Sequence, residues 1–366
     1  MAEHVTAAAL GALPRGLWRR LELSPLRFAV LEREGQLGRL SEAERAAGKR
    51  AYYQTLARSV AIRETLALVV SEGARVGAEV LPLKGSVLAF AVYPDPGMRP
   101  MADVDVAVSP DRLEALAARL EALGYARYGA GKRRYQLAHH HHLALFKAGA
   151  PPIELHARLF HELALDGDTA PLFARAIPPT ALSEVEGRNR LNSHPSTSSG
   201  LSEMGSSSPT TGYAGLVPGW NDHVLYVALH AATHGFADSP LWLFDLAYLV
   251  PRLSPDALAV IAAEAKRRRG VAALHFAFAL ATRCLPSLLL AAPPPTGKRL
   301  RASLLDALLG ADPFARKPDR RRAQLLRWAL TDHPIDALRS IAGKLRLVAA
   351  EALFETAPPP PPPPPP

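Results

Sequence analysis

The sequence is poor in the features that define several protein classes. Its 366 residues include a single cysteine, Cys284, which excludes an internal disulfide and a zinc site built from cysteines. It has no long hydrophobic run, because the most apolar stretch, residues 271–292, is interrupted by His275, Arg283 and Pro286. No basic segment followed by an apolar one occurs at the N-terminus, so we expect no export signal. These absences predict a soluble, cytoplasmic protein that does not associate with a membrane.

The chain also has fewer acidic than basic residues. Lys and Arg number 43 against 34 Asp and Glu, which gives a formal net charge of +9. A basic surface favours phosphate-bearing partners, although the arginine clusters at 267–269 and 320–322 fit a solvated helix face about equally well. Hydrophobic residues make up 48% of the chain and charged residues 21%, a composition typical of ordered globular proteins. At this length we expect two packed units and some unstructured sequence.

Apolar patterning divides the chain into regions. We predict a helical segment at 1–50, an α/β (α+β) core at 51–182, a disordered Ser/Gly-rich insertion at 183–215, an all-helical C-terminal domain at 216–356 and a polyproline tail at 357–366. Within the core we expect a helix at 52–76, a strand at 79–84, a helix at 87–93, a strand at 103–108, a helix at 110–123, a loop or hairpin, and strands at 141–146 and 153–158. This order predicts a mixed sheet with helices packed on it.

Two acidic residues on one predicted strand are the first candidates for chemistry. Asp103 and Asp105 alternate with Val104 and Val106, so both carboxylates should emerge on one face of the strand. Adjacent carboxylates repel one another unless a cation neutralises them, and hard oxygen ligands suit Mg²⁺ or Mn²⁺. Acidic pairs at strand ends are more often solvated than metal-bound, so the pair alone does not identify a site.

A predicted phosphate-binding turn supplies the context for this pair. The preceding strand ends at Gly85 and Ser86, and a helix follows at once. Gly85 allows a close approach of the backbone, Ser86 offers a hydroxyl, and the helix start presents free amide groups. By itself the turn is an ordinary capped helix start. Beside an acidic pair on the neighbouring strand, it indicates a site for a phosphate group and a metal ion.

Several motifs carry a resemblance to a known family. They are Leu83-Lys84-Gly85-Ser86, Tyr93-Pro94, the run at 99–108 and Ile153-Glu154-Leu155-His156. Together they resemble the uncharacterised nucleotidyltransferase family within the DNA polymerase β superfamily. Later motifs at 229–235 and 241–247 are similar to that family's helical half. The resemblance spans residues 50–290 apart from the insertion.

The resemblance implies an activity and a set of metal ligands. Asp103 and Asp105 correspond to the superfamily's paired metal-binding acids, and Glu154 to its third acid on a neighbouring strand. The implied reaction transfers a nucleoside monophosphate from an NTP to a hydroxyl acceptor and releases pyrophosphate, with metal ions on the triphosphate. Glu154 is then the candidate to take the proton of the acceptor, which is a small molecule, a protein or a nucleic acid.

The resemblance also implies how the nucleotide is bound. Gly85 and Ser86 would meet the triphosphate, and Lys84, which precedes them, would add its charge. Arg99 would stabilise developing phosphate charge. Alternatively, Arg99 pairs with one of the two paired aspartates and only orients it.

Histidines suggest further groups near the site. His156 lies two residues after Glu154, hence on the same strand face, where it serves as a hydrogen-bond partner, an additional ligand or a structural residue. His230 and His234 are spaced for one helix face and, with Asp245, are expected on the substrate side of the cleft or buried in the helical half. The run at 139–142 is not expected to bind zinc, because strand alternation sends its members to opposite faces.

Other functions stay open at this point. A catalytically inactive member of the same fold would bind a nucleotide or a protein and act as a regulatory module. A third hypothesis is a hydrolase whose metal is held by His230, His234 and Asp245. We predict the nucleotidyltransferase, because only this function uses all three acids.

Overall fold

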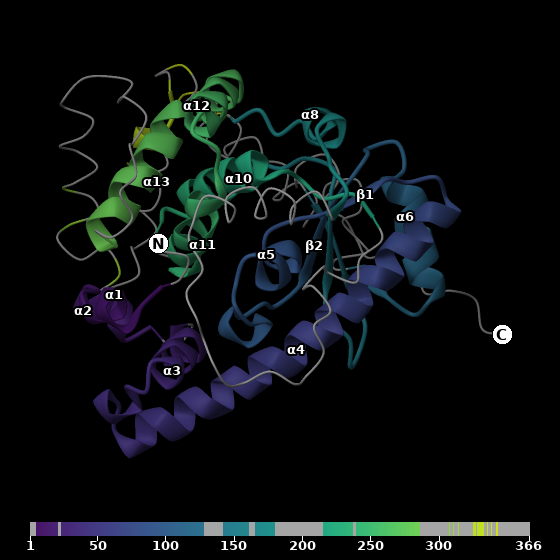
Figure 1. Cartoon of the computed structure of the whole chain (residues 1–366). Helices are drawn as coiled ribbons and strands as arrows, with labels where there is room; N and C mark the ends of the chain where they lie inside the picture. The colour runs from purple at the N-terminus through teal and green to yellow at the C-terminus, as the bar shows by residue number, and fades with distance from the viewer. Residues whose placement is uncertain are drawn as a thin grey trace.

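The computed structural model describes most of the predicted core and the start of the helical half. The described residues are 5–20, 23–127, 142–160, 165–179, 215–236 and 239–285, with single positions between 307 and 342. The predicted insertion at 183–215 lies outside them except for its last residue, as do the polyproline tail and most of residues 286–356. A sheet lobe and a helical lobe lie side by side, and one long helix, α4, runs along the sheet lobe (Figure 1).

The sheet of the described residues is mixed, as predicted. Its strands are β1 (Val80–Pro82), β2 (Val104–Val108), β3 (Ala126–Arg127), β4 (His142–Phe146) and β5 (Ile153–His156). They lie in the order β1-β2-β5-β4-β3. Only the pair β2 and β5 is parallel, and the other pairs are antiparallel. The central parallel pair brings residues about fifty positions apart in sequence into register.

Helices account for most of the remaining described structure. In the N-terminal half they are α1 (Ala7–Gly11), α2 (Arg15–Trp18), α3 (Ser24–Arg33), η2 (Leu37–Arg39), α4 (Glu42–Arg75), α5 (Gly85–Ala91), η3 (Pro96–Met98) and α6 (Leu113–Ala122). After the sheet come α8 (Ala170–Ala174), α10 (Trp220–Thr233), α11 (Leu241–Leu249), η5 (Val250–Arg252), α12 (Ala257–Arg267) and α13 (Val271–Cys284). The elements after residue 216 are therefore helical as far as residue 285.

The long helix α4 begins ten residues earlier than the sequence predicted. The residues before position 52 were expected to form short helices, yet α4 starts at Glu42 and runs for 34 residues. A capping box explains the earlier start: the Ser41 hydroxyl accepts from the Glu44 amide at 3.3 Å, and the Glu44 carboxylate accepts from the Ser41 amide at 2.9 Å.

Helix α6 starts later than predicted and ends where predicted. Residues 110–112 form a turn, and the carbonyl of Ser109, rather than its hydroxyl, accepts from the amides of Arg112 and Leu113. At the other end Gly124 has a φ of +89°, and its amide donates to the Glu121 carbonyl while Tyr125 donates to Leu120. This bond pattern is a Schellman motif, which requires a left-handed residue at the position of Gly124.

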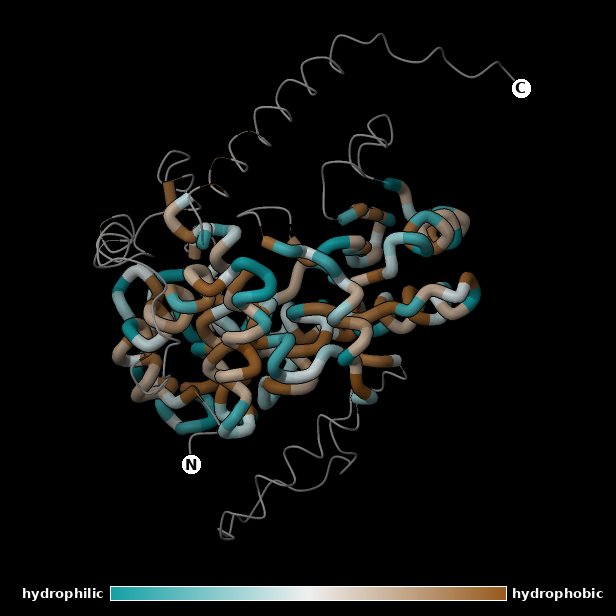
Figure 2. The backbone as a smooth tube through the Cα atoms, turned by 90° about the horizontal axis from the view of Figure 1, so that it is seen from above, coloured by the Kyte–Doolittle hydropathy of each residue, from teal (hydrophilic) through white to brown (hydrophobic). Residues whose placement is uncertain are grey.

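Alternation along β2 separates the core from the site. Val104, Val106 and Val108 pack with α4 and α6 in one buried cluster, whereas Ala107 belongs to the larger cluster that includes α5 and the helical lobe. Apolar segments accordingly run through the middle of the molecule (Figure 2). Asp105 therefore faces the helical lobe, opposite the valines, as the pattern predicts.

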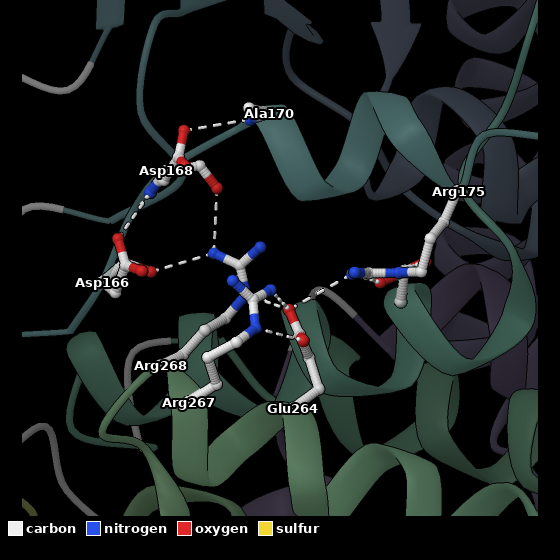
Figure 3. A network of polar contacts seen from close by, with 8 residues as sticks. Asp166, Asp168, Ala170, Arg175, Glu264, Arg267 and Arg268 are labelled. Carbon is white, nitrogen blue, oxygen red and sulfur yellow. Dashed lines mark hydrogen bonds and ion pairs between the residues drawn. The ribbon is translucent and has the colours of Figure 1, made fainter.

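A buried arginine connects the helical lobe to the chain segment that follows β5. Arg268, 2% exposed, donates to the carbonyls of Asp166 and Asp168 at 2.9 and 3.0 Å and to Glu264 at 2.7 Å (Figure 3). Arg175 of that segment also reaches Glu264, at 3.2 Å. The cluster at 267–269 is thus only partly a solvated helix face, because its central member is structural.

Among the described residues, no helix combines the length and the apolar character needed to cross a membrane.

Replacing Gly124 by Ala should lower the free energy of unfolding by about 1 kcal/mol, because a residue with a Cβ is strained at positive φ. Urea denaturation measures this change. Gly38→Ala is the matched control, since an added Cβ there meets nothing within 4 Å and its φ is not positive. An equal loss in both variants would contradict the assignment of Gly124 as the helix stop.

Candidate active site

The turn between β1 and α5 has an unusual backbone. Lys84 adopts φ 45° and ψ −124°, a conformation that L residues rarely adopt. Its carbonyl accepts from the amide of Leu88 at 2.9 Å, and its ammonium donates to Asp105 Oδ1 at 3.1 Å. Strain of this kind persists where surrounding contacts fix it, and it concentrates at functional sites.

Gly85 makes room for protein side chains. A Cβ at this position would collide with Arg99 Nη1 and with Met101, whose Sδ would lie 2.9 Å away. The glycine is therefore required by close packing on the loop before β2. The neighbouring Ser86 is 4% exposed, and its hydroxyl has no hydrogen-bond partner among the described residues.

Asp105 is a buried carboxylate in contact with a lysine ammonium and a histidine ring. Its Oδ1 lies 3.1 Å from Lys84 Nζ and 2.9 Å from His156 Nε2. Burial alone raises the pKa of Asp105, but the Lys84 charge and the His156 hydrogen bond outweigh it and hold the pKa well below its usual value. Asp105 is therefore ionised and already paired.

Asp103 lies one residue before β2 in the opposite electrostatic situation. Burial, followed by the negative charges of Asp105 and Glu154, raises the pKa of Asp103 to about 6. The nearest cations are engaged with Asp105, so Asp103 faces an excess of negative charge. A bound divalent cation would remove that excess.

Glu154 reaches the same place from β5. The parallel register places Glu154 beside Asp105, and the antiparallel register of β4 places His142 beside His156. Glu154 lies 3.5 Å from His156 Nε2 and 3.7 Å from His142 Nε2. The ligating atoms of His142, Glu154 and His156 all lie within 4.8 Å of one another, as in a metal site.

His142 is a site residue that sequence reasoning missed. Strand alternation predicts that the members of the run at 139–142 point to opposite faces, and pairing with β5 brings His142 to Glu154. The other members of the run lie outside the described residues. Carboxylate oxygens suit hard cations such as Mg²⁺ or Mn²⁺, whereas imidazole nitrogens suit Zn²⁺ or Fe²⁺, so this mixed donor set does not select one divalent cation.

Arg99 is paired, though not with the aspartates on β2. Its Nε and Nη2 donate to the two oxygens of Asp245 on α11, each at 2.7 Å, and the Tyr93 hydroxyl donates to Asp245 at 2.8 Å. Arg99 is 7% exposed and Asp245 2%. This buried bidentate pair joins the loop before β2 to the helical lobe.

A cavity of about 190 Å³ lies between this pair and the helical lobe. Its lining residues are Lys84, Arg99, Val227, His230, Ala231, His234, Phe236, Ser239, Leu241, Trp242 and Asp245. Burial, and then the charge of Lys84, holds the pKa of His230 well below its usual value, so this histidine is neutral. The structure thus brings His230, His234 and Asp245 to one cavity beside Lys84.

These residues give no support to the hydrolase hypothesis. Both oxygens of Asp245 are bonded to Arg99, which leaves this carboxylate committed to a structural pair. The metal-ligating group found among the described residues consists of His142, Glu154 and His156 and does not include His230 or His234.

Asp103→Asn should raise the melting temperature of the metal-free protein at neutral pH. Folding raises this pKa from 3.8 to about 6, so the folded state binds the proton more tightly and loses stability as pH rises through that interval. The increase in melting temperature caused by Asp103→Asn should therefore be complete above about pH 6 and vanish below pH 3.8. Melting in the presence of a chelator measures it, with the surface variant Asp111→Asn as control. A lower melting temperature of Asp103→Asn at neutral pH would refute the prediction.

Asp245→Ala should lower the free energy of unfolding by about 3–5 kcal/mol, because it leaves the Arg99 charge buried without a partner. The double variant Arg99→Met, Asp245→Leu should recover part of that loss in chemical denaturation. Asp222→Ala is the control: its partner Arg175 is 40% exposed, so a loss of at most about 1 kcal/mol is expected. If the double variant were as unstable as the single one, the buried charge would not be the cause.

Comparison with known proteins agrees with this geometry. A search of curated proteins finds no match to the chain. A family model described as an uncharacterised nucleotidyltransferase matches residues 16–286, which is most of the described structure and includes both lobes. The chain belongs to this nucleotidyltransferase family.

Proposed function

We propose that this chain is a metal-dependent nucleotidyltransferase that moves a nucleoside monophosphate from an NTP to a hydroxyl acceptor. The observation that carries the proposal is the register of β2 and β5, which sets Asp105 beside Glu154, with Asp103 two residues before Asp105 in the chain. The turn at Lys84 to Ser86 lies directly against these acids. Family membership supports nucleotidyl transfer as the reaction class.

Asp103, Asp105 and Glu154 would hold Mg²⁺ or Mn²⁺. The raised pKa of Asp103 supports this role, since the acids carry more negative charge than the protein itself neutralises. His142 and His156 adjoin Glu154 and would orient it or complete the ligand set. When bound, the metal supplies positive charge to the triphosphate and to the leaving pyrophosphate.

The protein groups would then perform the transfer as follows. The oxygen of the acceptor hydroxyl bonds to the α-phosphorus, the bond from that phosphorus to the bridging oxygen breaks, and pyrophosphate leaves. The hydroxyl proton passes to the carboxylate of Glu154, which is partly exposed and ionised because neighbouring histidines lower its pKa against the effect of burial. Lys84 and Ser86 would bind the triphosphate beside the acids.

Arg99 has a supporting role in this proposal. Its packing against Gly85 and its buried pair with Asp245 favour a function in holding the phosphate turn in place. Direct contact with the phosphates is the alternative, because Arg99 also lines the cavity.

The cavity beside Lys84 would take an uncharged part of a substrate. Its volume of about 190 Å³ exceeds that of an engineered protein cavity of ~150 Å³ that binds benzene, so it accommodates a single ring. Its walls are mainly apolar, His230 is neutral, and Arg99 is already paired. His234 and Asp245 would complete the substrate side. We further propose a cytoplasmic site of action, for which the single cysteine is the support.

One observation favours a second candidate, an inactive nucleotide- or protein-binding module. Lys84 and His156 neutralise Asp105 without a metal, so this acid is satisfied by the protein's own groups. A regulatory module that binds NTP through Lys84 alone would have the same arrangement.

Asp103→Ala combined with Asp105→Ala should reduce nucleotidyl transfer by at least about 10²-fold, because the charged site is lost. The assay incubates the protein with each of the four α-labelled NTPs and Mg²⁺ or Mn²⁺, with a cell extract as acceptor source, and follows label transfer and pyrophosphate release. Asp111→Ala serves as a surface control. Retained transfer in the double variant would overturn the assignment, and silence of the wild type with every NTP would favour the binding module.

A further inference from the structure

A buried tyrosine on the helical lobe has a hydroxyl for which the fold provides no partner. Tyr226 on α10 is 4% exposed, and its hydroxyl oxygen makes no hydrogen bond among the described residues. A buried polar group left without a partner costs free energy that a phenylalanine at the same position would avoid. Such a group in a folded protein therefore requires an explanation.

The position of Tyr226 suggests that explanation. Its ring centroid lies 5.9 Å from the ammonium of Lys84, 5.4 Å from the ring of Phe160 and 5.9 Å from that of His230. The ring of Tyr226 therefore lies near Lys84, which belongs to the turn between β1 and α5. It also lies beside His230, which lines the cavity.

Ser86 presents a second hydroxyl of the same kind. It is buried, it also has no partner among the described residues, and it lies two residues after Lys84. Ser86 comes from the sheet lobe and Tyr226 from the helical lobe. A phosphate group bound at Lys84 would offer buried hydroxyls of this kind a charged acceptor.

We propose that the Tyr226 hydroxyl donates a hydrogen bond to the triphosphate of the bound nucleotide and completes the phosphate site from the helical lobe. This inference rests on the proposed function. Burial raises the pKa of Tyr226 and outweighs the charge of Lys84, which lowers it, so the phenol stays protonated and acts as a donor. A neutral hydroxyl donor contributes to phosphate binding without adding a further charge to a site that already holds several charged side chains.

Removing the Tyr226 hydroxyl should affect protein stability and triphosphate binding in opposite directions. Tyr226→Phe removes one oxygen atom that is unsatisfied in the free protein, so the denaturation midpoint should stay unchanged or rise. The same variant should bind the triphosphate about tenfold more weakly, the loss expected for one hydrogen bond to a charged group. A merely structural tyrosine would lose stability and keep its affinity.

Isothermal titration with Mg²⁺-tripolyphosphate and with each Mg²⁺-NTP tests this, because tripolyphosphate reports the phosphate site without a base. The full chain is used throughout, and urea denaturation is measured in parallel. Tyr93→Phe is the matched control, since Tyr93 is also buried but its hydroxyl donates to Asp245 at 2.8 Å. This variant should be destabilised by the loss of that bond.

The outcomes separate this inference from the proposed function. Weaker binding by Tyr226→Phe at unchanged or higher stability supports it, with the same fold-change for tripolyphosphate and for NTP. Wild-type affinity in Tyr226→Phe, or a destabilisation similar to that of Tyr93→Phe, overturns the inference and leaves the proposed function intact. A wild type that binds neither tripolyphosphate nor any NTP overturns both.

Discussion

The buried carboxylate of Asp105 is the constraint on which the site depends. Strand alternation directs it away from the valine core and toward the helical lobe, where an isolated charge would be costly. Lys84 and His156 offset that cost by contacting the same oxygen. The Lys84 contact fixes the turn before α5, and the His156 contact fixes the end of β5. Neutralising the Asp105 charge therefore holds the proposed phosphate turn and Glu154 beside β2.

A second buried ion pair, Arg99 with Asp245, likewise offsets the cost of burying charge, here between the two lobes. Arg99 and Asp245 are 146 residues apart in the chain, and their bidentate contact, with Tyr93 added, holds α11 against the loop before β2. Because Arg99 also packs on Gly85, the phosphate turn is connected to the helical lobe through one guanidinium. Arg99 and Asp245 both line the cavity beside Lys84, so the shape of the cavity depends on this ion pair. The pair is neutral as a whole and adds no net charge to the group of acids.

Sequence reasoning found what depends on local periodicity and missed what depends on register. Alternation directs Asp105 away from the valine core, and Gly124 marks a helix end, since both follow from a few adjacent residues. The early start of α4 was missed because a capping box outweighed the change in apolar pattern. The approach of His142 to Glu154 depends on how β4 pairs with β5, and the partner of Arg99 lies on a distant helix. No pattern in one strand or loop encodes either contact.

Several departures from ordinary protein structure lie close to Lys84. Lys84 has a strained backbone, and Ser86 and Tyr226 have buried hydroxyls without partners among the described residues. Burial, followed by the charges of Asp105 and Glu154, raises the pKa of Asp103. Each departure costs stability in the free protein, and each would be relieved by an anionic ligand with a divalent cation. Folding alone provides no reason to keep all of them near Lys84. The proposed binding of a nucleotide with its metal ion would explain their coincidence.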